Sequence, residues 1–144
     1  MAAAQTTRET PSLIRLVDGP VGTSNRPSLK MSVPCGAVMT FHGMVRPSEE
    51  GEMIDGLEYQ VYEPMTTREL RRLVNRQQAK HGVVAVSVEH SFGFVPNGHC
   101  SFVLQVASPH RAEAISFADE FISEMKKQVP IWKVPRLATP SEDS

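Results

Sequence analysis

The sequence predicts a single α+β domain, and three observations support that prediction. Its 144 residues suit one domain with a sizeable core. Short runs of alternating apolar and polar residues predict strands, and two longer stretches have the apolar spacing of helices. Asn97-Gly98 stands between two strand-like runs and is a strong signal for a tight antiparallel turn. The order of elements is typical of a split β-α-β unit with an additional hairpin-rich sheet.

The first part of the chain is expected to be mostly strand and loop. Residues 12–21 (SLIRLVDGPV) alternate enough for a strand, which Asp18-Gly19-Pro20 should end. A buried strand is expected in 35–45 (CGAVMTFHGMV) and a further strand in 54–62 (IDGLEYQVY). The polar segment between them, 46–53 (RPSEEGEM), predicts a mobile surface loop.

The first helix is bounded by two signals. Thr66 and Glu69 fit a capping box at its start, and Gly82 suits its C-terminal cap. Apolar residues follow at helical spacing between these ends. The two runs after it, 83–90 (VVAVSVEH) and 99–107 (HCSFVLQVA), should pair around the Asn97-Gly98 turn.

The second helix is expected to begin near Pro109, with Ser108 as its cap, and to stop before Pro130. Its apolar stripe is Ala114, Ile115, Ala118, Phe121, Ile122 and Met125. The resulting domain plan is a flexible N-terminus at 1–11, one domain at 12–133 and a short, loose polar tail at 134–144.

Bulk composition excludes several classes of function. The formal net charge is −1, so no overall positive field indicates nucleic acid or a membrane surface as partner. No apolar run is long enough to span a membrane, and the first residues lack the apolar core of a signal peptide. Cys35 and Cys100 lie in no metal-binding or redox spacing, which fits a reducing cytoplasm. A role as small buried hydrophobes is favoured over that of a catalytic thiol.

His110 and Arg111 form the first candidate site, at the start of the second helix. A helix N-terminus attracts anions through its unpaired amides and partial positive charge. Cationic side chains there do not favour the helix, so an anionic ligand such as phosphate explains them better. The alternative is a surface pair that contacts Glu113 or Glu89.

Two lysines form the second candidate site, around the sequence QVPIWK. Lys126 lies in the last helical turn, where it could simply stabilise the helix dipole, as could Lys127. A sharp turn at Pro130 would return Lys133 towards Lys126, with Trp132 expected to pack as an anchor. Lys127 should point about 100° away from Lys126. Arg46, considered by itself, is typical of an arginine in a surface loop. Together, the two candidate sites and Arg46 predict one cationic pocket formed by Arg46, His110, Arg111, Lys126 and Lys133.

Four segments together resemble a known family. They are GAVMTFHGMVR, LEYQVYEPM, VEHSFGFVPNG and SPHRAEAISFADEFISEMKKQVPIWK, and they resemble the catalytic (large) subunit of molybdopterin synthase, in order and with similar spacing. The resemblance implies an α+β fold with a hammerhead-type β arrangement, an additional antiparallel sheet and two main helices. It implies sulfur transfer to cyclic pyranopterin monophosphate, which gives molybdopterin. The sulfur donor would be the C-terminal Gly-Gly thiocarboxylate of a small ubiquitin-like subunit, in a heterotetramer built on a homodimer of this chain.

The resemblance also implies roles for individual residues. Lys126 matches the catalytic lysine beside the small subunit's terminus, and Lys133 the catalytic lysine beside the pterin. His110 and Arg111 match an anion-binding pair. The implied substrate-binding set is Met44, Val45, Arg46, His110, Arg111, Lys126, Lys133, Val134 and Pro135. No cofactor and no metal is implied.

Two other classes of function remain open at the level of sequence. One is a non-catalytic relative that dimerises and binds a ubiquitin-like partner, which the short tail would suit. The other is a small-molecule-sensing α+β domain, suggested by the order of elements alone. The five cationic residues argue against the first, and the lysine fixed beside Trp132 argues against the second.

Overall fold

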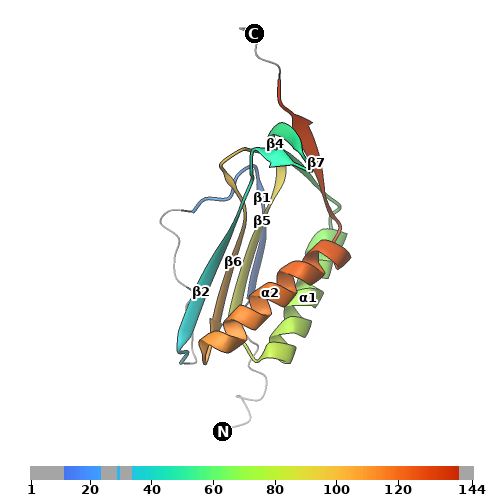
Figure 1. The fold of residues 1–144 in the computed structure, drawn as a ribbon. Helices are drawn as coiled ribbons and strands as arrows, with labels where there is room; N and C mark the ends of the chain where they lie inside the picture. Colours follow the sequence, from blue (N-terminus) through green and yellow to red (C-terminus); the bar gives the residue numbers. More distant parts are fainter. Residues whose placement is uncertain (1–11, 24–28, 30–33, 140–144) are drawn as a thin grey trace.

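A computed structural model describes residues 12–23, 29 and 34–139. It contains a curved seven-stranded sheet with two helices packed on one face (Figure 1). The expected α+β class is confirmed. The elements are β1 (Ser12–Asp18), β2 (Ala37–Met44), β3 (Ser48–Glu49), β4 (Glu52–Val61), α1 (Met65–His81), β5 (Ala85–Pro96), β6 (Cys100–Ser108), α2 (Arg111–Gln128) and β7 (Ile131–Leu137).

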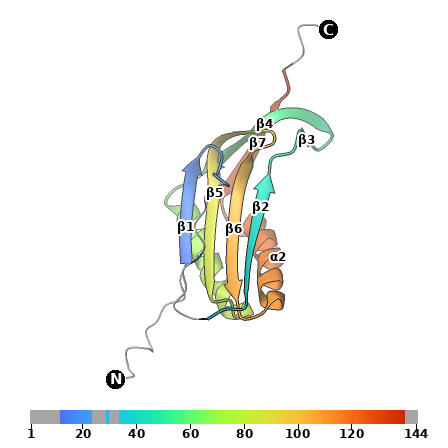
Figure 2. The same cartoon turned by 90° about the vertical axis from the view of Figure 1, so that its left-hand side faces the viewer.

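The long strand β5 joins the two parts of the sheet. Its first part pairs with β6 on one side and with β1 on the other, and its last four residues, Gly93–Pro96, pair with β4. Figure 2 shows β1, β5, β6 and β2 side by side, with β4 and β7 crossing at one end. The β1–β5 pair is parallel and the other pairs are antiparallel. The Asn97-Gly98 turn joins β5 to β6, as the sequence predicts.

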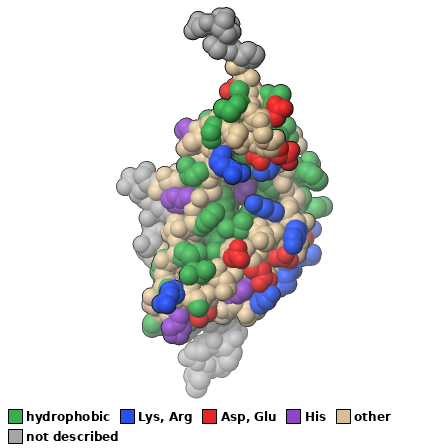
Figure 3. All heavy atoms as spheres, viewed as in Figure 1, with side chains coloured by type: hydrophobic (Ala, Val, Ile, Leu, Met, Phe, Trp, Pro, Cys, Tyr) green, Lys and Arg blue, Asp and Glu red, His purple; other side chains and the backbone are tan. Residues whose placement is uncertain are grey.

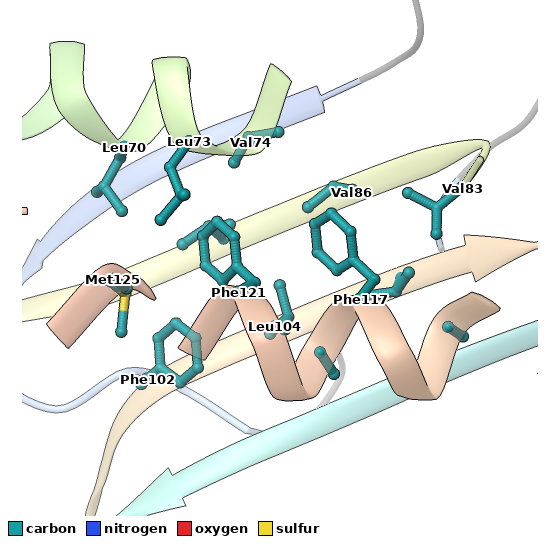
Figure 4. Packing of buried hydrophobic residues seen from close by; sticks show 14 of the residues in the cluster. Leu70, Leu73, Val74, Val83, Val86, Phe102, Leu104, Phe117, Phe121 and Met125 are labelled. Atoms are coloured by element: carbon teal, nitrogen blue, oxygen red, sulfur yellow. The ribbon is translucent and has the colours of Figure 1, made fainter. Parts of the chain in front are cut away.

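The main core lies between the two helices and the sheet (Figure 4). Phe117 and Phe121 of α2 are fully buried and stack with their ring centroids 5.4 Å apart. They meet Leu70, Leu73 and Val74 of α1, also buried. Truncating either phenylalanine to alanine would cost about 3–5 kcal/mol of stability. This packing fixes the axis of α2, whose last turn carries Lys126.

The start of α1 differs from the predicted capping box. Its N-cap is Pro64 and makes no side-chain cap bond. The Thr66 hydroxyl instead donates to the Pro130 carbonyl at 2.8 Å and accepts from the Tyr62 N–H. Thr66 therefore ties the first turn of α1 to the corner that leads from α2 into β7. Gly82 has the left-handed conformation of a C-terminal cap, as predicted.

The start of α2 also differs from the prediction. The N-cap is His110, which forms a capping box with Glu113, so Pro109 lies outside the helix. The Ser108 hydroxyl donates to the His110 carbonyl rather than capping the first amides. Ile115, expected in the apolar stripe, is 54% exposed. The helix ends at Gln128, just before Pro130, as predicted.

Three further expectations are corrected by the strands. β2 is not buried, because it is an edge strand that, among the described strands, pairs only with β6, and Val38 is 53% exposed. The expected loop at 46–53 contains a tight hairpin, because β3 pairs with the start of β4. β7 continues through Leu137, so the first residues of the expected loose tail form a strand beside β4. The flexible N-terminus at 1–11, most of the loop expected between β1 and β2, and residues 140–144 lie outside the described residues.

No helix in the described part of the chain is both long and apolar enough to cross a membrane.

Candidate functional site

A cleft of about 760 Å³ opens between β2, the C-terminal end of α2, and β7. Strands β3 to β6 complete its walls. Figure 3 views the face with this hollow, where hydrophobic side chains line the depression and basic side chains gather at one end. We refer to it below as the cleft. Its rim is formed by the exposed residues Arg46, Lys126 and Lys133, and its floor by Tyr59, His90, Ser101, Phe102 and Met125.

The rim carries three cationic side chains. Arg46 follows β2, Lys126 lies in the last turn of α2, and Lys133 lies on β7. All three residues are exposed. Lys133 Nζ lies 3.1 Å from Glu49 Oε1 of the β3–β4 hairpin. The cleft therefore presents N–H donors and positive charge to an anionic ligand, with one carboxylate already engaged.

The floor is polar on one side and apolar on the other. Tyr59 of β4 donates its hydroxyl hydrogen to Ser101 Oγ of β6 at 3.0 Å. Burial raises the pKa of Tyr59, although the bond to Ser101 and the charge of Lys133 act in the opposite direction. Tyr59 therefore stays a neutral phenol. Phe102 and Met125 supply the apolar part.

His90 of β5 is the most buried titratable group on the floor, with 6% of its surface exposed. Its Nδ1 lies 2.8 Å from the Ser91 carbonyl oxygen. The ring contacts Tyr59 edge-on, with centroids 5.1 Å apart, and also approaches Phe102. Burial lowers the pKa of His90, which outweighs the opposite effect of the Ser91 hydrogen bond. The imidazole is therefore neutral at physiological pH.

The corner at Pro130 brings the two lysines together. β7 runs antiparallel to β4, with Lys133 directly opposite Tyr59. That register returns the chain across the cleft, so Lys126 and Lys133 line the same space, as the sequence predicts. The expected burial of Trp132 is wrong, because 61% of its surface is exposed. The Thr66 bond to the Pro130 carbonyl holds the corner instead.

Lys127 occupies a different environment from Lys126. It lines a smaller hollow of about 420 Å³ beside the corner, and its Nζ lies 3.7 Å from Glu124 Oε2. Lys126 borders both hollows. The predicted divergence of the two neighbouring lysines is thus confirmed in position.

His110 and Arg111 do not join the rim cations within one chain. Both are exposed at the N-terminal end of α2. Fifteen residues of helix separate Arg111 from Lys126, which corresponds to about 22 Å. Within one chain the predicted cationic pocket therefore contains Arg46, Lys126 and Lys133 but not His110 and Arg111. His110 Nδ1 lies 3.5 Å from Glu113 Oε1, the surface contact that the sequence left open.

The remaining expected substrate contacts fall into two groups. Met44 lines the cleft. Val45 is buried, its N–H donates to His99, and its carbonyl accepts from Gly98, so these bonds occupy its backbone. Val134 and Pro135 of β7 pair with Glu58 and Leu57 of β4, and neither Val134 nor Pro135 lines the cleft.

The described residues contain no group of three or more side chains able to hold a metal ion. Cys100 is buried and its thiol donates to the Phe102 carbonyl, while Cys35 is half-buried. Neither cysteine lines the cleft. The role of a small buried residue is confirmed for Cys100.

Sequence reasoning missed most of the cleft's lining, including Glu49, Tyr59, His90 and Ser101. Glu49 sits in a segment expected to be a loop, and its partner is 84 residues away. Tyr59, His90 and Ser101 belong to strands whose pairing brings them together. A signal existed for His90, because it and Glu89 are titratable residues within a strand that is otherwise small or apolar.

Comparison with known proteins decides the family. The family model described as MoaE protein matches residues 21–128. The chain belongs to the MoaE family. The molybdopterin synthase catalytic subunit of Taeniopygia guttata is 37% identical over 106 residues, covering 73% of this chain and 68% of that protein. The Rattus norvegicus subunit is 39% identical over 105 residues, covering 73% of this chain and 52% of that protein. The chain spans about half the length of the rat and human relatives.

Two solved structures resemble this chain, and the first of them supports the MoaE assignment. Molybdopterin synthase from Staphylococcus aureus superposes with a TM-score of 0.74 at 28% identity, covering 87% of this chain and 91% of that one. A complex of subunits 1 and 2 of molybdopterin-converting factor from Helicobacter pylori gives a TM-score of 0.67 at 24% identity, covering 88% and 86%. The latter likeness supports the fold alone.

Proposed function

We propose that this MoaE-family chain is the catalytic subunit of a molybdopterin synthase. It would convert cyclic pyranopterin monophosphate to molybdopterin with sulfur from the C-terminal thiocarboxylate of a small ubiquitin-like subunit. The observation that carries the proposal is the convergence of Lys126, Lys133 and Arg46 on the rim of one cleft. Family membership over most of the chain supports it.

The chemistry assigned to the cleft follows from its charges. The thiocarboxylate sulfur attacks a side-chain carbon of the pterin, so that a C–S bond forms while the bond from that carbon to oxygen breaks, and the oxygen leaves on phosphate or as water. Water then cleaves the acyl–sulfur bond, which leaves the sulfur on the pterin and releases the small subunit's carboxylate. Lys126 donates and accepts the protons of these steps and stabilises negative charge on oxygen. Lys133 and Arg46 hold the substrate's anionic end. Met44, Val45, Val134 and Pro135 complete the proposed substrate-binding set, and of these four Met44 lines the cleft.

The partner is proposed to be the small subunit, whose glycine-rich tail is thin enough to enter the cleft along strand-like backbone. The H. pylori protein that shares this fold is itself a complex of subunits 1 and 2 of molybdopterin-converting factor. We also propose a homodimer within a heterotetramer, a hammerhead-type arrangement of the strands around β4 and β7, and action in the cytoplasm.

A homodimer gives His110 and Arg111 a role that one chain does not allow. They lie about 22 Å along α2 from Lys126, so they can serve the same site only if a second copy supplies them. In a symmetric dimer each copy would complete the other's cleft. The anion-binding pair would then face the rim cations across the interface.

The test is reconstitution. The purified chain is mixed with thiocarboxylated small subunit and cyclic pyranopterin monophosphate, and molybdopterin is measured. The proposal expects product and a matching loss of thiocarboxylate. Stable binding of the small subunit without any product would instead support the non-catalytic relative.

A further inference from the structure

The cleft separates two kinds of polar group. The rim side chains Arg46, Lys126 and Lys133 are cations, which only donate hydrogen bonds, and the carboxylate among the lining residues, Glu49, already pairs with Lys133. The floor side chains Tyr59, His90 and Ser101 are neutral, and each keeps an acceptor lone pair. An elongated ligand that is anionic at one end and rich in N–H groups at the other would match both ends of this cleft.

His90 has a defined tautomer. The Ser91 carbonyl can only accept, so the 2.8 Å contact requires the hydrogen to be on Nδ1. A neutral ring with hydrogen on Nδ1 has a free lone pair on Nε2. Fixing the first nitrogen against the backbone also fixes the direction in which that lone pair points.

The acceptor on His90 has no protein partner among the described residues. The hydrogen bond of His90 is the one from Nδ1, and its two ring contacts are with Tyr59 and Phe102. In the described part of the chain, the fully buried side-chain atoms without a partner are Gln78 Nε2 and Asn97 Oδ1. Nε2 of His90 is not among them, although the residue is 94% buried, so this atom reaches the surface of the cleft.

We propose that His90 Nε2 accepts a hydrogen bond from an N–H group of the substrate's ring and so sets the orientation in which the ring enters the cleft. This inference rests on the proposed function and adds a positioning residue on the floor. A reduced pterin carries ring and amino N–H donors, which are the groups that the cationic rim cannot bind. With the ring against His90, the anionic end of the substrate faces Lys133 and Arg46.

Two amide variants separate this role from simple packing. In His90→Asn, the shorter amide can keep the donor to the Ser91 carbonyl but has no acceptor at the position of Nε2. In His90→Gln, the longer amide can place its oxygen near that position. Both variants remove the buried ring, so both should lower the thermal stability. If His90 served only to pack the floor, the two variants would have no reason to differ in ligand affinity.

Calorimetry uses three probes and no small subunit: cyclic pyranopterin monophosphate, a phosphate-free tetrahydropterin, and inorganic phosphate. His90→Asn should weaken the two pterins about threefold to tenfold, the loss expected for one neutral hydrogen bond. His90→Gln should stay within about twofold of wild type, since it restores an acceptor. Inorganic phosphate should bind all three proteins equally. Equal pterin affinity for wild type and His90→Asn would overturn the inference, as would equal losses in the two variants.

A measurement on the wild-type protein covers the case in which a variant does not fold. In ¹⁵N-labelled protein, the His90 resonances should show hydrogen on Nδ1 and none on Nε2. The Nε2 signal should shift when cyclic pyranopterin monophosphate is added, and stay unchanged with inorganic phosphate. An Nε2 signal that the pterin does not move would overturn the inference. If the wild type fails to bind the pterin at all, the proposed function falls as well.

Discussion

Glu49 should restrain anion binding at the rim of the cleft. Its carboxylate lies 3.1 Å from Lys133 Nζ, and its side chain is 16% exposed against 52% for Lys133. An anion bound about 3 Å from Nζ would lie within about 6 Å of this carboxylate. At that distance two unit charges repel by about 0.7 kcal/mol in water and about 3 kcal/mol at an effective dielectric constant of 20.

The variant Glu49→Gln removes that repulsion and frees Lys133. Because Lys133 is half exposed, the lower part of the range applies, about 0.7–1.4 kcal/mol, which corresponds to binding about threefold to tenfold tighter. The ion pair itself contributes at most about 1 kcal/mol to folding, so the variant should remain folded. The measurement is calorimetric titration with cyclic pyranopterin monophosphate at low salt.

Glu52→Gln is the matched control for this prediction. Glu52 pairs with Glu49 in the same hairpin, is exposed, and lies outside the lining of the cleft. Both variants change the net charge equally, so a general charge effect would make them alike. The difference should also shrink in 0.5 M salt, where screening shortens the range of the interaction. Equal affinities for the two variants at low salt would refute the reasoning.

Three further predictions concern other parts of the molecule. The double change Cys35→Ala, Cys100→Ala should cost some stability but retain turnover per folded molecule; complete loss of activity in a well-folded protein would indicate a persulfide mechanism. Arg111→Ala should weaken precursor binding more than small-subunit binding, and mixed dimers with Lys126→Ala chains should regain activity if the site spans two copies. Hydrogen bonds from Lys80 and Gln77 lower the pKa of Glu120 to about 2. Stability from this carboxylate is therefore present above pH 4.5 and lost towards pH 2, and the loss should be absent in Glu120→Gln.

Helices, strands and turns were predicted well, because the signals for them lie in residues that are neighbours in the sequence. Gly82 and the Asn97-Gly98 turn need positive φ, which glycine allows, and Pro130 cannot continue a helix. The capping residues were harder, because several candidates compete at a helix start. Thr66 had the pattern of a cap, yet its hydroxyl bonds the Pro130 carbonyl 64 residues away.

The part of the site that was predicted also depends on residues close together in the sequence. Lys126 and Lys133 are joined by a short corner, so their meeting could be inferred from the chain between them. His90 and Glu49 come together with them only through strand pairing, which sequence spacing does not reveal. Trp132 was expected to pack as an anchor beside Lys133, but 61% of its surface is exposed. The length of α2 places His110 and Arg111 at the far end of the helix from the lysines. This separation could have been calculated from the sequence, because the rise per residue of a helix is known.

The most direct test of the account compares Lys126 with Lys127. Both lie in the last turn of α2, so the helix dipole stabilises both by about 0.3–1 kcal/mol. Lys126 alone reaches the cleft, while Lys127 lies near Glu124 beside the smaller hollow. Single-turnover formation of molybdopterin is measured with saturating thiocarboxylated small subunit. Lys126→Ala should lose at least about a hundredfold in rate, as expected for a positioned acid–base group, and Lys127→Ala should match wild type. Equal rates for the two variants would contradict the account.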